Sequence, residues 1–264
     1  IKEVADIGRP KGIPLIIDNT ASPVICKPLA HGAAIVMHSL TKYIGGHGTS
    51  IGGIVVDGGN FDWTKNRKRQ PLLNEPDQSY GGAVWIDAVP QLTGANIPFV
   101  IRLRVVLLRD TGAPLAPFNA WQIIQGLETV GLRMKQHCSN AEKVVTFLET
   151  QKKVQNVIYP TNHQGEIKER AKKYMQGGYG SLVGMDVGTK ENGAKFIDNL
   201  KMLYHVANIG DARSLAIHPA TTTHSQLNEK ELLAAGVTPG YVRLSIGIEH
   251  PDDIIADIKQ ALAA

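Results

Sequence analysis

Apolar residues first gather in three short runs near the start of the chain. The runs cover residues 13–18, 33–38 and 51–57, and each has the length of a strand. They do not alternate with polar residues, which is typical of strands that helices cover on both faces. A helix around residues 4–7 ends at Gly8, just before the first run, as in half of a βαβ unit. This part of the chain predicts an α/β domain with a mostly parallel sheet.

After the three apolar runs come a stretch with the composition of a loop and then a short apolar stretch. Residues 61–96 are rich in Gly, Pro, Asn and Gln, which predicts a long surface loop with short helical turns. We expect Trp63 and Trp85 to be isolated anchors in that loop. Residues 99–109 are densely apolar and predict a helix that Gly112 ends.

A long helical pattern opens at Pro117. Apolar residues recur at helical spacing from Trp121 to Leu127 and, in steps of four and three, from Met134 to Leu148. Such a stripe is more typical of a packed core than of a cofactor site. We interpret this helix as the bridge between two domains, 1–130 and 131–264.

Strands and helices alternate in the remainder. In residues 241–246 a period of two sends Val242, Leu244 and Ile246 to one face and Arg243 to the other. Further strands are expected at 154–159, 181–187 and 205–209, and helices at 166–175, 190–203 and 251–262. The sequence therefore predicts a small C-terminal α/β domain.

Length and charge set limits on the class of protein. With 264 residues and 43% hydrophobic content, the chain can bury one large core or two smaller ones. Its net charge of +4 raises the question of nucleic acid, but the one dense basic run, 65–69, has no aromatic interleaving and is expected to be a solvated loop. A weak alternative is a basic binding module, for which DNA binding would depend on salt.

Membrane and metal sites are not expected either. No run reaches the ~18 to 20 apolar residues of a membrane span, and the first residues have no signal-peptide pattern, so we expect a cytoplasmic protein. Cys26 and Cys138 favour reduced thiols, with Cys26 as a small core residue rather than a nucleophile. The spacing of His218 and His224 matches no zinc site, and a core role is expected for them.

Candidate chemistry gathers after the second apolar run. Lys42 is flanked by the hydroxyls of Ser39 and Thr41, and glycines follow at 45, 46 and 48. A lysine amine can form a Schiff base with an aldehyde cofactor, while hydroxyls and closely approaching glycine backbone can hold a phosphate. Asp18 ends the first run, where an acid can keep a pyridinium nitrogen protonated. Together these residues predict a site for pyridoxal 5'-phosphate (PLP).

Each of these residues also has an ordinary interpretation. Asp18 can be a turn residue or helix cap, Ser39 and Thr41 can be turn hydroxyls, and Lys42 can be a surface lysine. For the glycines, a mobile turn and close packing near a cofactor stay equally open. The combination favours the cofactor.

Three blocks of sequence, 18–57, 212–226 and 237–249, resemble the cystathionine γ-synthase family of PLP-dependent enzymes, and within it the O-acetylhomoserine sulfhydrylases. The resemblance implies the fold of aspartate aminotransferase, fold type I, with part of the PLP-binding large domain followed by a small domain. It places the cofactor linkage on Lys42 and phosphate contacts on Ser39 and Thr41. Asp18 would then contact the ring nitrogen, and Thr20 would lie beside the ring.

A substrate carboxylate site is implied by the last two blocks. An arginine on a rigid strand can hold a carboxylate through two parallel hydrogen bonds. Residues 243–249 resemble the family segment R-L-S-x-G-I-E, whose arginine binds the substrate α-carboxylate, so the resemblance gives this role to Arg243. Ser214 matches the position that adds a second contact.

The activity implied is a γ-replacement on O-acetyl-L-homoserine by sulfide or a thiol, giving L-homocysteine or methionine and acetate. Cystathionine γ-synthase and methionine γ-lyase share the same four residues, Asp18, Lys42, Ser214 and Arg243, and stay open as alternatives. The family's cofactor-stacking tyrosine and glycine-rich phosphate loop would lie upstream of Ile1. We therefore expect a homotetramer whose activity needs a missing N-terminal portion, or else a non-catalytic fragment.

Overall fold

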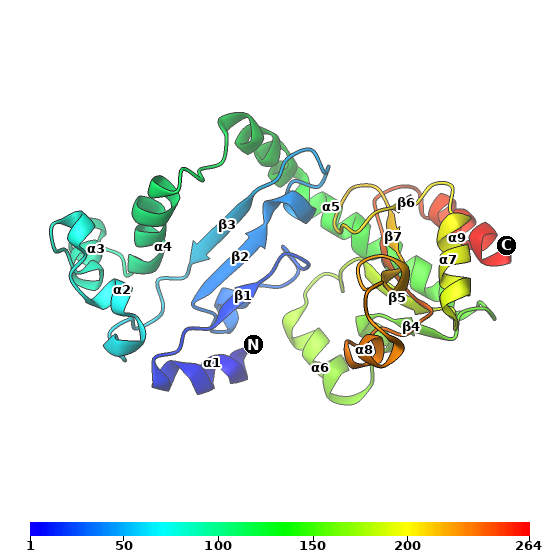
Figure 1. Ribbon diagram of the computed structural model, residues 1–264, viewed down its shortest axis with the longest axis horizontal. Coiled ribbons are helices and arrows are strands. Elements are labelled where there is room, and N and C mark those ends of the chain that lie inside the picture. The colour runs from blue at the N-terminus through cyan, green and yellow to red at the C-terminus, as the bar shows by residue number, and fades with distance from the viewer. The chain divides into compact units, whose positions relative to one another are not determined.

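The computed structural model describes residues 1–264, which form two units (Figure 1). The N-terminal unit consists of residues 1–20, 27–40 and 51–121. The C-terminal unit consists of residues 21–26, 41–50 and 122–264. The expected boundary near Gly131 lies in the same continuous helix, α5 (Pro117–Glu149), in which this division passes from one unit to the other, between Trp121 and Gln122. The segment 41–50, with Lys42, also belongs to the C-terminal unit.

The sheet of the N-terminal unit is mixed. It consists of β1 (Ile16–Asp18), β2 (Ile35–Ser39) and β3 (Gly53–Asp57), in that order. β1 and β2 are parallel, as predicted, but β2 and β3 are antiparallel. The prediction of a mostly parallel sheet is wrong here because no crossover helix connects β2 to β3, and a parallel pair needs such a connection.

The strands of this sheet are less covered than continuous apolar runs predict. Ile16, Met37 and Ile54 leave between 41% and 48% of their surface exposed. Helices therefore do not cover both faces of the described sheet along its whole length.

The stretch expected as a surface loop contains an apolar core. Trp63 and Trp85 are buried, and the Trp63 ring stacks on Phe99 with ring centroids 5.5 Å apart. Both tryptophans belong to one cluster with Ile35 of β2, so they are not isolated anchors. The helices of this unit are α1 (Lys2–Gly8), α2 (Pro71–Asn74), α3 (Trp85–Thr93) and α4 (Pro98–Arg102), the last continued by helical turns at Leu103–Leu108.

No single helix combines the length and apolar content of a membrane span, although α3 and the segment 98–108, bent by 100° to each other, reach that content as a pair.

α5 is one helix of 33 residues, and its two halves differ in burial. The stripe expected from Met134 to Leu148 is buried, which confirms core packing for the second half. In the first half Trp121, Ile124 and Leu127 are each more than half exposed, so the same prediction is wrong there.

The C-terminal unit is built on a second sheet. Its strands are β4 (Asn156–Ile158), β5 (Leu182–Asp186), β6 (Tyr204–His205), β7 (Leu215–Ile217) and β8 (Tyr241–Ser245), in the order β4-β5-β8-β7-β6. Its helices besides α5 are α6 (Gly165–Tyr174), α7 (Lys190–Asp198), α8 (Glu229–Ala234) and α9 (Pro251–Ala263). The sequence did not predict β7 or α8, which have only three and six residues.

β8 is the central strand of this sheet and confirms the predicted alternation. Val242, Leu244 and Ile246 are fully buried and pack in one cluster with residues of α5 and α9. Arg243 lies on the other face of the strand and is only partly buried. The sheet therefore holds this arginine on a backbone that is paired on both sides, to β5 and to β7.

Candidate active site

The candidate catalytic lysine lies in a short turn directly after β2. Residues Leu40–Ile44 wind into a single helical turn whose regular geometry is interrupted at Lys42 (φ −88°, ψ −133°). The Lys42 ammonium donates a hydrogen bond to Asn208 Oδ1. Burial, and then the positive charge of Arg243, lower the pKa of Lys42. A lower pKa increases the fraction of uncharged amine, which is the form that attacks an aldehyde.

Asn208 connects the lysine to the candidate carboxylate site. Its side-chain oxygen accepts from Lys42, and its backbone carbonyl accepts from Arg243 Nη2 at 3.4 Å. Arg243 has no ion pair with an acidic side chain in the structure, so its guanidinium charge is not compensated by a carboxylate. No local sequence pattern pointed to Asn208, because 166 positions separate it from Lys42.

Ser214, the residue predicted to add a second contact to the substrate carboxylate, is hydrogen-bonded to Glu249 and Gly247. Ser214 is fully buried, and its hydroxyl donates to Glu249 Oε2 (2.9 Å) and accepts from the Gly247 N–H (2.8 Å). Its backbone N–H also donates to Glu249, at 2.6 Å. A substrate carboxylate would have to displace the Glu249 carboxylate to reach this hydroxyl, so the role of Ser214 stays a prediction.

A second group of predicted residues lies in the N-terminal unit, where β1 and β2 end. The Thr20 N–H donates to Asp18 Oδ1 (2.9 Å), and the Ser39 N–H donates to Thr20 Oγ1 (2.7 Å). Because the two strands are parallel, these hydrogen bonds join their C-terminal ends. Hydrogen bonds from the Thr20 side chain and then its backbone lower the pKa of Asp18, which keeps the carboxylate ionised at neutral pH.

The glycines after Lys42 pack closely. Gly46 has φ +73°, and a Cβ at this position would lie 2.1 Å from Arg133 Nη1. The backbone N–H of Gly46 donates to the Lys42 carbonyl (2.7 Å), and its carbonyl accepts from the Ala212 N–H (2.8 Å). For Gly46 the structure therefore favours close packing over a mobile turn.

These residues fit the chemistry that PLP needs. The structure brings Asp18, Thr20 and Ser39 together in one unit, and Lys42 and Arg243 together in the other. An amine of lowered pKa and an ionised carboxylate are the kinds of side chain that PLP-dependent enzymes use at the aldehyde carbon and at the ring nitrogen. No group of three or more His, Cys, Asp and Glu side chains is placed to hold a metal ion.

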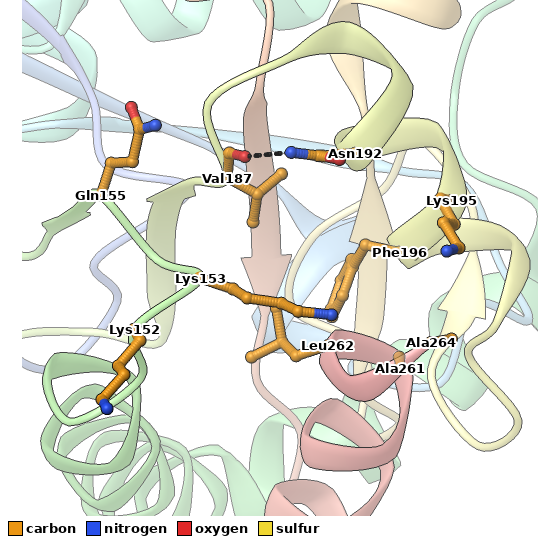
Figure 2. A pocket seen from close by; sticks show the side chains of 10 residues that line it. All are labelled: Lys152, Lys153, Gln155, Val187, Asn192, Lys195, Phe196, Ala261, Leu262 and Ala264. Atoms are coloured by element: carbon orange, nitrogen blue, oxygen red, sulfur yellow. Dashed lines mark hydrogen bonds between the residues drawn. The ribbon is translucent and has the colours of Figure 1, made fainter.

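A surface hollow in the C-terminal unit contains none of these residues. It has a volume of about 290 Å³ and lies beside α7 and α9 (Figure 2). Lys153 extends across it towards Phe196, and no Asp or Glu side chain lines it. It shares no lining residue with the Lys42 turn, and we assign it no role in the proposed chemistry.

Comparison with known proteins identifies the family. Residues 1–263 match the sequence model of a family described as Cys/Met metabolism PLP-dependent enzyme. The chain belongs to this family. The family inferred from the three sequence blocks is confirmed, and so is the predicted α/β fold of a PLP-dependent enzyme.

Relatives in this family carry closely similar names. The chain is 49% identical to O-acetyl-L-homoserine sulfhydrylase of Leptospira meyeri over 99% of its own length and 60% of the relative. It is 43% identical to homocysteine synthase of Schizosaccharomyces pombe, with 99% and 60% covered. A crystal structure of a Campylobacter jejuni protein, described as an O-acetylhomoserine (thiol)-lyase with N'-pyridoxyl-lysine-5'-monophosphate, matches with a TM-score of 0.89 and 40% identity, over 100% of this chain and 62% of that one. The chain thus spans about three fifths of the length of these relatives.

A buried histidine behind the lysine turn leads to a prediction about pH. His137 is fully buried, its Nδ1–H donates to the Ile246 carbonyl (2.7 Å), and burial lowers its pKa from 6.5 to about 4. The folded state therefore favours the neutral ring, which stabilises the protein above pH 6.5 and ceases to do so as the pH falls towards 4. We expect the unfolding free energy to fall by about 2 kcal/mol from pH 7 to pH 5, because His137 takes up a proton more readily in the unfolded state.

Urea denaturation at the two pH values measures this loss. His137→Gln should remove that part of the pH dependence, whereas the same change at the exposed His205 should leave it intact. An equal loss in wild type and His137→Gln would show that His137 is not the group responsible.

Proposed function

We propose that the protein containing this chain replaces the acetoxy group of O-acetyl-L-homoserine by sulfide or a thiol, giving L-homocysteine or methionine and acetate. The observation that carries the proposal is the cluster of Lys42, Asn208 and Arg243, which sets an amine of lowered pKa beside an uncompensated guanidinium. A PLP-dependent enzyme that acts on an amino acid needs a lysine amine to bind the cofactor and a cationic group to bind the substrate carboxylate. The names of the relatives support the choice of substrate.

The cofactor roles follow the predicted residues. When bound, PLP withdraws electrons from the substrate Cα, so that protons at Cα and Cβ become acidic. Lys42 would hold the cofactor through its amine and, once the substrate has replaced it, would move those protons. Asp18 would keep the ring nitrogen protonated. Ser39 and Thr41 would contact the phosphate, and Thr20 would lie beside the ring.

Arg243 is proposed to bind the substrate α-carboxylate. Its place on a strand paired on both sides limits its motion, and its planar group can form two parallel hydrogen bonds to a carboxylate. Ser214 would add a contact only where Glu249 releases its hydroxyl.

Features beyond this chain complete the proposal. Because the chain spans about 60% of its relatives, we propose that catalysis also needs the residues they carry beyond the match, in a homotetramer. Cys26 and Cys138 are not joined in a disulfide, which is compatible with a cytoplasmic location. Cystathionine γ-synthase and methionine γ-lyase chemistry would use the same residues, so the products formed must decide between the three.

The test uses a protein of the relatives' full length that contains this chain. With O-acetylhomoserine and sulfide it should release homocysteine and acetate, and it should do so faster than it forms cystathionine from cysteine or cleaves methionine. Arg243→Lys should raise the KM for O-acetylhomoserine by roughly 30-fold or more, because Lys cannot reproduce the forked contact and a broken charge pair costs roughly 2 to 4 kcal/mol.

Arg213→Lys is the matched control. Arg213 directly precedes Ser214 in the sequence, but its side chain is half-exposed and paired with Asp211. Its replacement should therefore leave the KM for O-acetylhomoserine unchanged. A wild-type KM in Arg243→Lys, or loss of the bound cofactor in that variant, would remove Arg243 from the carboxylate site.

A further inference from the structure

An arginine of α5 is buried without an acidic partner. Arg133 leaves only 6% of its surface exposed, and its guanidinium donates to three backbone carbonyls: Tyr43 (2.6 Å), Ile44 (2.9 Å) and Gly126 (2.6 Å). Its Nε–H donates to Thr129 Oγ1 at 3.2 Å. A buried charge is costly unless it is hydrogen-bonded, and here carbonyl oxygens supply all the strong partners.

Two of the three carbonyls belong to the residues that directly follow Lys42. The close approach depends on glycines on both sides. A Cβ at Gly46 would lie 2.1 Å from Arg133 Nη1, and a Cβ at Gly126 would lie 2.3 Å from the Gly45 carbonyl oxygen. The local backbone is therefore shaped to place the lysine turn against this one side chain.

Tyr43, the next residue after the lysine, is also fixed from other directions. It is fully buried, its hydroxyl shares a hydrogen bond with Ser181 Oγ (2.8 Å), and its ring meets the edge of His137 with centroids 5.4 Å apart. A Cβ at Gly210 would lie 2.6 Å from the Tyr43 ring. With the ring held in this way, the Arg133 contacts determine how the peptide that leaves Lys42 is oriented.

We propose that Arg133 is a positioning residue for Lys42. By holding the Tyr43 and Ile44 carbonyls, it sets the direction in which the Lys42 side chain leaves the backbone, and it touches neither substrate nor cofactor. This role rests on the proposed function, in which Lys42 captures the cofactor.

The test follows the capture of PLP by Lys42. The cofactor is removed from the full-length protein and added back, the return of the ~420 nm band is timed, and borohydride trapping with peptide mapping identifies the labelled lysine. In Arg133→Met the capture rate at Lys42 and kcat should each fall by roughly tenfold to a hundredfold, with KM nearly unchanged, because small errors in positioning have effects of this size. Arg133→Lys should recover part of both rates.

Asp257→Asn is the control for a merely structural effect. The buried Asp257 carboxylate also binds loop backbone, the N–H groups of residues 201–203, but it does not touch the Lys42 turn. It should lower Tm without changing either rate. If Arg133→Met does not fold, the capture rate and kcat are measured instead in Arg133→Lys and in Gly126→Ala, whose added Cβ would push against the Gly45 carbonyl.

Two outcomes would overturn the proposal in different ways. Wild-type capture and kcat in the Arg133 variants, with only Tm lowered, would make Arg133 structural and leave the proposed function intact. A label on another lysine in the unsubstituted protein would refute the proposed function itself, and with it the purpose given to Arg133.

Discussion

Replacing Lys42 by arginine is expected to remove catalysis almost completely. Arginine keeps the positive charge and much of the length, but its guanidinium stays protonated and forms no stable linkage to an aldehyde. The full-length variant should lose the ~420 nm band and the borohydride label at residue 42, and its turnover should fall by roughly a thousandfold or more. Absorbance, peptide mapping and a homocysteine assay measure the three effects.

Lys135→Arg controls for the substitution itself. Lys135 is an exposed residue of α5, so this variant should keep the absorbance band and the activity. If Lys42→Arg kept the band, or if the label in the wild type mapped to another lysine, Lys42 would not be the cofactor lysine.

The Asp18→Asn protein is expected to bind PLP and yet turn over slowly. The amide has nearly the shape of the carboxylate and can still accept the Thr20 N–H, but it carries no charge to keep a pyridinium nitrogen protonated. We expect kcat to fall by roughly a hundredfold or more, with the absorbance band retained. Steady-state kinetics and the cofactor spectrum together test this expectation.

The chain provides a close control for this change. Asp62 accepts hydrogen bonds from the backbone and side chain of Thr64, and these bonds lower its pKa, as those from Thr20 do for Asp18. Asp62→Asn should therefore disturb a turn of the same kind without affecting kcat. Turnover near the wild-type value in Asp18→Asn would exclude the proposed pairing with the ring nitrogen.

Local patterns predicted those features that local physics determines. The alternation in residues 241–246 placed Arg243 opposite a buried face, because side chains on a strand alternate by geometry alone. The order of acid, hydroxyls and lysine pointed to PLP because the cofactor requires those groups. Neither inference needed knowledge of distant contacts.

Other features depend on contacts that no local pattern records. Asn208 accepts a hydrogen bond from Lys42, 166 positions away in the sequence. Glu249 accepts a hydrogen bond from the Ser214 hydroxyl, 35 positions away. The lysine turn joins the C-terminal unit through Arg133, 90 positions away from Tyr43, so a boundary drawn from sequence at one point could not describe the units. The composition of residues 61–96 resembles a loop, although aromatic packing gives that stretch a core.

Asn208 accepts from Lys42 through its side-chain oxygen and from Arg243 through its backbone carbonyl, and this places two cationic groups close together, with consequences for the timing of proton transfer. Without cofactor and substrate, the Arg243 charge adds to burial in lowering the pKa of Lys42, which favours the uncharged amine that captures an aldehyde. A carboxylate bound to Arg243 would cancel that repulsion and raise the pKa of Lys42 again. In the proposed reaction, the bound substrate would therefore make Lys42 a stronger base once its amine has been released, which is when a proton must leave Cα.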